Sequence, residues 1–108
     1  MYEISKSDWK KFREKIPDWQ ERYMECLANE YVSLLNNDSM PASDRFWELE
    51  KRIKKDKKNP GVIIQLKKSD AIWDIAAMIN LRVITVDDLA DFSDDLKAAV
   101  ALICSRNI

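Results

Sequence analysis

The chain has 108 residues, of which 46% are hydrophobic and 9% aromatic, and its formal net charge is -1. This length predicts one domain over residues 1–108, with enough apolar side chains for one core. It contains a single glycine, which disfavours nucleotide-binding folds and sheets with tight hairpins, because these need glycine where the backbone turns sharply or approaches a ligand. We therefore expect an all-α protein.

Membrane and disulfide-rich classes are also disfavoured. The apolar runs at residues 75–79 and 98–104 are five and seven residues long, and a membrane-spanning helix needs roughly 18 or more. We expect a cytoplasmic protein without a signal peptide or a membrane segment. The chain has no histidine, and Cys26 and Cys104 lack CxxC spacing, so we expect no metal, no cofactor and two cysteines in the core.

The first predicted helix covers residues 5–16. Ser5 can cap it, and Asp8, three residues later, can return the bond to the cap. Pro17 disfavours helical geometry in the residue before it and favours a helix start, so we expect a break there. A second, clearly amphipathic helix follows over residues 17–36, with an apolar stripe formed by Tyr23, Met24, Leu27, Ala28, Tyr31, Leu34 and Leu35.

A third helix is predicted over residues 44–58, with Phe46, Leu49 and Ile53 on its buried side. "NPG", residues 59–61, ends it. Apolar residues then alternate over residues 62–66, which predicts a short extended connector that sends Val62, Ile64 and Leu66 into the core.

A fourth helix, residues 70–80, is apolar around most of its circumference and is expected to be the most buried one, with Ser69 as its cap. Thr85 and Asp88 have capping-box spacing, and Ser93 can cap a last helix. The chain is thus predicted to form a compact bundle of five or six helices. The second and fourth helices should supply most of its core.

The third helix carries a dense basic run: Lys51, Arg52, Lys54, Lys55, Lys57 and Lys58. Residues 43–68 hold nine basic and four acidic side chains, and residues 69–108 hold three basic and seven acidic ones. Such a run is typical of a surface for the phosphate backbone of nucleic acid. It also suits a solvated helix end, since cations favour the C-terminal end of the helix dipole, and we favour this interpretation.

Most aromatic side chains are expected in the core. Phe46 and Trp47 are an exception, because adjacent residues point in different directions around a helix, and one of them can be exposed to anchor a partner. Acidic pairs such as Asp70 and Asp74 share a helix face, but no histidine, glycine-rich loop or nucleophile motif accompanies them. We therefore expect no enzyme, and Asp74 is the acid to inspect because its helix is so apolar.

Two segments, "FWELEKRIKKDKKNPGV" at residues 46–62 and "ITVDDLADFSDDLK" at residues 84–97, carry a resemblance over nearly the whole chain. The chain resembles a family of small uncharacterised bacterial proteins, some of which bear an automatic multidrug-transporter label. The resemblance implies no catalytic or binding residues, and the hydropathy of the chain argues against the transporter label.

These observations predict a non-enzymatic interaction or regulatory module that docks a protein partner or a second copy of itself. The candidate binding residues are Trp47 and the basic run. The alternative function is sequence-independent binding of nucleic acid by the basic run.

Overall fold

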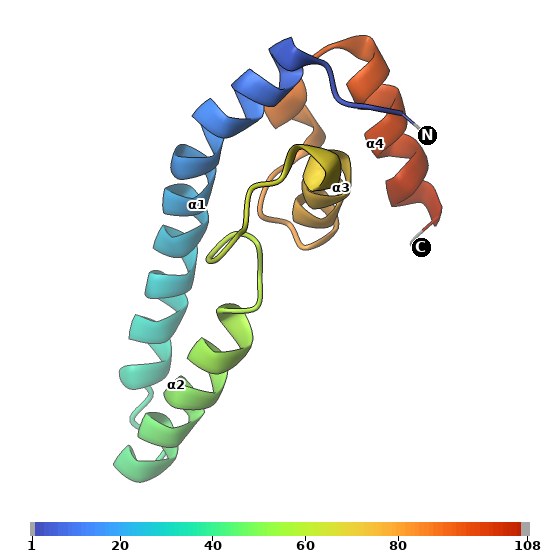
Figure 1. Cartoon of the computed structure of the whole chain (residues 1–108). Helices are drawn as coiled ribbons and strands as arrows, with labels where there is room; N and C mark the ends of the chain where they lie inside the picture. Colours follow the sequence, from blue (N-terminus) through green and yellow to red (C-terminus); the bar gives the residue numbers. More distant parts are fainter. Residues whose placement is uncertain (1, 107–108) are drawn as a thin grey trace.

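The computed structural model describes residues 2–106, and within them it contains four α-helices, two short 3-10 helices and no strand (Figure 1). The all-α prediction is confirmed. In chain order the elements are α1 (Lys6–Leu35), α2 (Ala42–Asp56), η1 (Lys68–Asp70), α3 (Ala71–Asn80), η2 (Val86–Leu89) and α4 (Asp94–Arg106).

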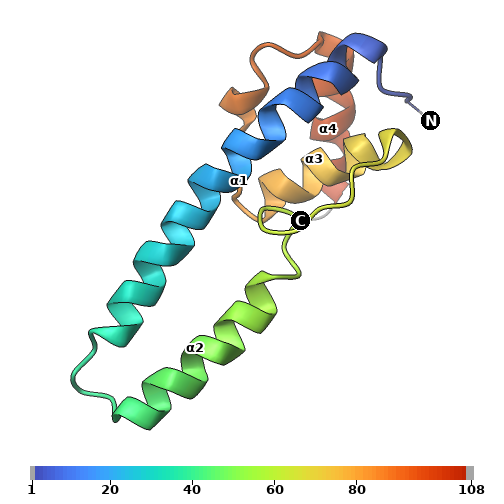
Figure 2. The ribbon, with the colours of Figure 1, turned by 60° about the vertical axis from the view of Figure 1, so that its left-hand side comes forward.

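The molecule is elongated rather than compact. Its principal extents are 51 × 28 × 22 Å and its radius of gyration is 16.5 Å, whereas a compact chain of this size has about 13 Å. Figures 1 and 2 show why: α2 and the C-terminal half of α1 form a hairpin that projects beyond the part containing α3 and α4. The prediction of a compact bundle is therefore wrong.

The predicted break at Pro17 is also wrong, because α1 is one helix of 30 residues with Pro17 inside it. A proline within a helix removes one backbone hydrogen bond and costs about 3 kcal/mol. Phe12, Ile16 and Trp19, on both sides of Pro17, are all buried in the same core, which offsets that cost. The N-terminal part of α1 bends relative to the rest (Figure 1). Because two predicted helices are one, and η2 is only a 3-10 turn, the α-helices number four instead of five or six.

The core lies where α3 and α4 meet the N-terminal half of α1. Ile75 and Met78 of α3 and Leu96 of α4 are completely buried, which confirms the expected burial of the helix at residues 70–80. The C-terminal half of α1 adds only Leu27 to the buried residues, so the second predicted helix does not supply much of the core. Ser69 does not cap α3, because the chain enters α3 directly from η1.

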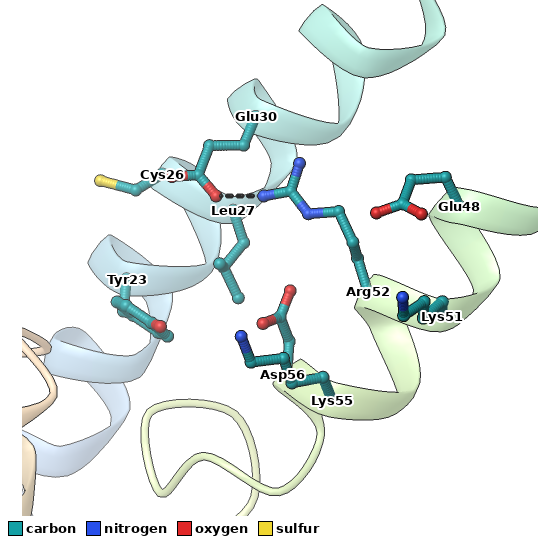
Figure 3. A pocket seen from close by; sticks show the side chains of 9 residues that line it. All are labelled: Tyr23, Cys26, Leu27, Glu30, Glu48, Lys51, Arg52, Lys55 and Asp56. Atoms are coloured by element: carbon teal, nitrogen blue, oxygen red, sulfur yellow. Dashed lines mark hydrogen bonds and ion pairs between the residues drawn. The ribbon is translucent and has the colours of Figure 1, made fainter. Parts of the chain in front are cut away.

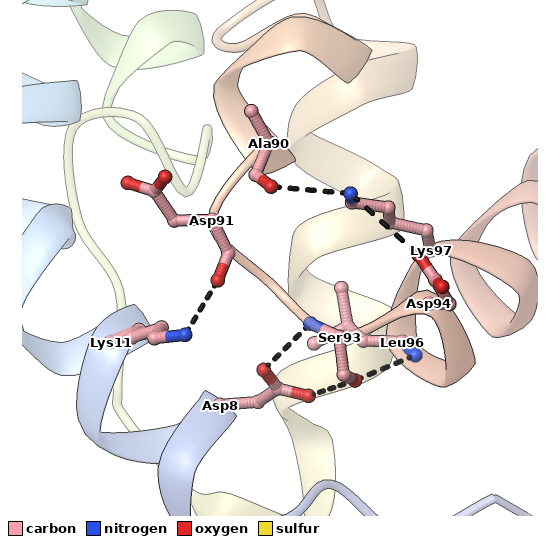
Figure 4. A network of polar contacts seen from close by, with 8 residues as sticks. All are labelled: Asp8, Lys11, Ala90, Asp91, Ser93, Asp94, Leu96 and Lys97. Carbon is pink, nitrogen blue, oxygen red and sulfur yellow. Dashed lines mark hydrogen bonds and ion pairs between the residues drawn. The ribbon is translucent and has the colours of Figure 1, made fainter.

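Three of the predicted caps are confirmed. Ser5 Oγ accepts a hydrogen bond from Asp8 N at 3.0 Å, Thr85 and Asp88 form the capping box of η2, and Ser93 Oγ accepts from Leu96 N at 3.2 Å. Asp8 does not return a bond to Ser5. Its carboxylate instead accepts bonds from the backbone and hydroxyl of Ser93, and so joins the starts of α1 and α4 (Figure 4).

An ion pair fixes η2 against α1. Nη1 and Nη2 of the Arg22 guanidinium donate to the carboxylate of Asp88, at 3.1 and 2.8 Å. Burial alone disfavours ionisation of Asp88, but Arg22 and Thr85 outweigh it and lower the pKa of this carboxyl below its ordinary value. The capping box therefore also docks η2 on the long helix.

The connector at residues 62–66 has neither helical nor strand structure, as predicted. Ile64 packs against the core, while Leu66 is 39% exposed and contributes little to it. The turn before the connector contacts α1: Gln20 Nε2 donates to the Pro60 carbonyl, and Asn59 Nδ2 donates to the Tyr23 hydroxyl, each at 3.0 Å. This turn determines where the projecting hairpin joins the core.

Candidate functional site

The hairpin of α1 and α2 carries all of the candidate binding residues. None of the residues of α2 is buried, although its apolar side chains have the spacing of a packed helix. Phe46 is 61% exposed and Ile53 is 38% exposed, while Leu49 is half-buried. The prediction that these three residues form a buried side is therefore wrong, with Leu49 as a partial exception.

Polar side chains connect α2 to α1. Arg45 donates to the carbonyls of Leu35 and Met40, Arg52 pairs with Glu30 at 2.8 Å, and the Tyr31 hydroxyl donates to Asp56. Arg52 also lies over the Tyr31 ring, 5.6 Å from its centroid. With these residues turned toward α1, the apolar stripe of α2 points to one side of the hairpin.

On the opposite side of the hairpin the two helices border a polar groove (Figure 3). Its volume is about 460 Å³ and its lining residues are Tyr23, Cys26, Leu27, Glu30, Glu48, Lys51, Arg52, Lys55 and Asp56. Three acidic and three basic side chains line it, so its charges balance. Burial and the hydrogen bond to Asp56 raise the pKa of Tyr31 to about 12, and burial followed by nearby carboxylates raises that of Tyr23.

The basic run does not act as one uninterrupted patch. Arg52 is held by Glu30, and Lys54 pairs with Glu50 at 3.0 Å. Lys51, Lys55, Lys57 and Lys58 are exposed and have no acidic partner within 4 Å among residues 2–106. Lys57 and Lys58 follow the end of α2, where their backbone amides close its last turn.

The side of the hairpin away from the groove is apolar. Its residues repeat with intervals of four, three and four in both helices: Met24, Ala28, Tyr31 and Leu35 in α1, and Ala42, Phe46, Leu49 and Ile53 in α2. Because side chains at these intervals share one helix face and the helices are antiparallel, both sets turn to the same side of the hairpin. We call these eight residues the apolar face.

The apolar face is open to solvent. Met24 and Leu35 are 44% and 42% exposed, and Trp47, at the edge of the face, is 62% exposed and meets Phe46 edge-on with ring centroids 5.0 Å apart. We predicted that one of Phe46 and Trp47 is exposed, and both are. Sequence reasoning did not find the α1 half of the face, whose only signal was the same four-three-four spacing within a stripe assigned to the core.

Trp73 and Cys26 also depart from the expected core positions. Trp73 is 47% exposed and Cys26 is exposed, whereas Trp19 is buried and Cys104 is half-buried. No group of three or more potential metal-ligating side chains occurs among residues 2–106, and no helix within that range is long and apolar enough to cross a membrane.

Asp74 has one carboxylate oxygen that is buried and has no hydrogen-bond partner. Burial, with a smaller contribution from Asp70, raises the pKa of this carboxyl from its ordinary 3.8 to about 6. The folded protein therefore binds the Asp74 proton more tightly than the unfolded chain does. The free energy of unfolding should fall as the pH rises from about 4 to about 6, and stay lowered above that range.

We expect Asp74→Asn to remove this pH dependence and to stabilise the protein at pH 7. The gain should be about 1 kcal/mol, since solvent around the exposed oxygen screens part of the effect. Urea unfolding of both proteins between pH 4 and pH 7.5 measures it, with the exposed Asp95→Asn as the control. If the free energies of unfolding of wild type and Asp74→Asn change with pH in the same way, burial does not raise the pKa of Asp74.

Comparisons with family models, with curated proteins and with solved structures find no match for this chain. The resemblance to small bacterial proteins stays a prediction. The candidate site is therefore defined by its geometry alone: a hairpin with a charge-balanced groove on one side and an exposed apolar face on the other.

Proposed function

We propose that the protein is a non-enzymatic interaction module that binds a helical protein partner on the apolar face. The observation that carries this proposal is the uncovered apolar stripe of α2. A helix of 15 residues is marginal in water by its own propensity, and helices of this length are usually stabilised by packing of their apolar side. Here three of the four stripe residues, Ala42, Phe46 and Ile53, are exposed, and only Leu49 is half-buried.

The composition of the face fits a docking role. Exposed aromatic side chains such as Phe46 and Trp47 are enriched among the residues that dominate binding energy. Residues spaced by four, three and four are the pattern that packs against another helix through knobs and holes. A helical partner would cover both stripes at once.

Site-specific photocrosslinking tests the proposal. A photoreactive phenylalanine analogue at position 46 should form one discrete adduct in the native host, and the same analogue at position 63 should not. Ile63 is a suitable control, because it is 61% exposed but lies in the connector outside the face. Absence of an adduct at position 46 would count against a docking role.

A second candidate function is binding of the nucleic-acid backbone by Lys51, Lys55, Lys57 and Lys58, the four lysines of the basic run that have no ion-pair partner among residues 2–106. Each phosphate contact contributes a slope of about -0.9 to the dependence of log affinity on log salt for duplex DNA. Lys51→Glu combined with Lys55→Glu should therefore make the slope less steep by about 2. Titration of a fluorescent duplex at several salt concentrations measures it, and an affinity that does not respond to salt excludes this function.

A further inference from the structure

We infer that the partner on the apolar face is a second copy of this chain, and that two hairpins form a four-helix bundle in which α1 of each copy packs against α2 of the other. This inference rests on the proposed function and specifies its partner. A two-fold axis parallel to the helices produces the arrangement, since it places each α1 over the other copy's α2 without shifting either helix along the axis.

The face has the shape and the spacing for such a bundle. Two adjacent stripes with heptad-like intervals on one side of a helical hairpin are half of the core of a four-helix bundle. α2 is about 22 Å long, and two helices side by side are about 20 Å wide. The footprint of such a face is about 440 Å². Its protruding side chains and the edge residues add to this area toward the roughly 800 Å² per partner that stable interfaces bury.

The contacts between α1 and α2 show which edge residues would meet. Arg52 pairs with Glu30, and Asn59 bonds to Tyr23, so Lys57, directly after the end of α2, lies at about the level of Glu25 of α1. The two-fold axis keeps these levels, and therefore brings Glu25 of one copy to the edge that carries Lys57 of the other. Neither side chain has an ion-pair partner among the described residues.

At the other end of the hairpin, apolar side chains of the two copies would contact each other. Val32, on the outer edge of α1, is 55% exposed, and Trp47, on the outer edge of α2, is 62% exposed. Both lie in the half of the hairpin nearer its tip, so the same axis places Val32 of one copy beside Trp47 of the other. Glu25 thus faces Lys57 near the core, and Val32 faces Trp47 near the tip.

The rest of the chain leaves room for the second copy. Phe12, Ile16 and Trp19, which hold α1 in the core, lie roughly 80° to 140° around the helix from Met24, all in the same direction. Pro17, one heptad before Met24 on the same side of α1, is exposed. α3 and α4 therefore pack on another side of α1 and do not obstruct the apolar face.

Light scattering after size-exclusion chromatography tests the inference on the full chain. The wild type at tens of micromolar should have twice the chain mass of 12.7 kDa. Phe46→Glu and, independently, Met24→Glu should raise the dissociation constant at least 100-fold and give the monomer mass. Ile63→Glu should stay dimeric, and circular dichroism should show the same helix content for every variant.

The arrangement of the helices has its own test. Glu25→Lys and Lys57→Glu should each weaken the dimer, and the double variant should restore it. Restoration would report on pairing between copies, because the two edges of one hairpin point away from each other and cannot pair within one chain. Failure of the double variant to restore the dimer would overturn this arrangement.

The result also separates this inference from the proposed function. A monomeric wild type overturns the inference. If position 46 then crosslinks to a different protein, the docking role stands with another partner. If it crosslinks to nothing, both are overturned.

Discussion

Replacing Asp8 with alanine is expected to lower the free energy of unfolding by about 3 kcal/mol. Asp8 is only 1% exposed, and its carboxylate accepts hydrogen bonds from the backbone nitrogen of Ser93, at 3.1 Å, and from the Ser93 hydroxyl. The same hydroxyl accepts the bond from Leu96 N that caps α4. Alanine would leave the Ser93 amide without its partner and loosen the cap of a second helix.

Thermal unfolding followed by circular dichroism measures this effect. A loss of this size should lower the melting temperature by on the order of 15 °C. Asp18→Ala is the matched control, since Asp18 is an exposed acid in the same helix, and its effect should be within about 0.5 kcal/mol. Asp8→Asn keeps the shape and one acceptor oxygen, and should lie between the control and Asp8→Ala.

A double-mutant cycle with Ser93→Ala tests the stated cause. If Asp8 acts through Ser93, the two changes together should cost clearly less than the sum of the two single changes. Additive effects would mean that Asp8 stabilises the protein in some other way. Asp8→Ala as stable as the wild type would contradict the prediction itself.

Asp8 also shows where inference from the sequence reaches its limit. The caps at Ser5, Thr85 and Ser93 were predictable because a capping bond joins residues three positions apart, and that spacing is visible in the chain. The pattern assigned the Asp8 side chain to the same local motif. Its real partner lies 85 residues away, and only packing of the two helix starts brings them together.

Pro17 is a second case in which tertiary packing overrides a local rule. The proline does disfavour the helix locally, and the cost is real. The sequence alone does not show that Phe12, Ile16 and Trp19 enter one core, and therefore does not show that the helix continues.

The predicted burial of the apolar side of α2 is wrong for a different reason. Amphipathic spacing correctly identifies which side of α2 is apolar, but it does not say whether the cover belongs to the same chain. Phe46 and Ile53 were assigned to the core of this chain, whereas the described chain leaves them exposed. An apolar helix face that its own fold does not cover is a signal for a partner, and it becomes visible only in three dimensions.

Gly61→Ala is the other substitution with a large expected effect, a loss of about 2 kcal/mol. The reason is space, because none of the described residues with positive φ is a glycine. A Cβ at position 61 would lie 2.5 Å from Cδ2 of Tyr23 and 2.8 Å from Cγ2 of Val83. Tyr23 cannot move freely to make room, since its hydroxyl accepts the bond from Asn59 that holds the turn on α1.

The sign of the change in the free energy of unfolding distinguishes steric overlap at position 61 from the usual effect of a glycine-to-alanine substitution. A glycine in open space normally gains about 0.4–1 kcal/mol on change to alanine, because the unfolded chain loses freedom. Urea unfolding should show a loss here, and in a Tyr23→Ala background the same change should cost much less. A stabilised Gly61→Ala protein would mean that the turn adjusts to the added methyl group. A measured loss would show that position 61 has no space for a side chain. The chain has its only glycine where α1, the turn at residues 59–62 and Val83 meet.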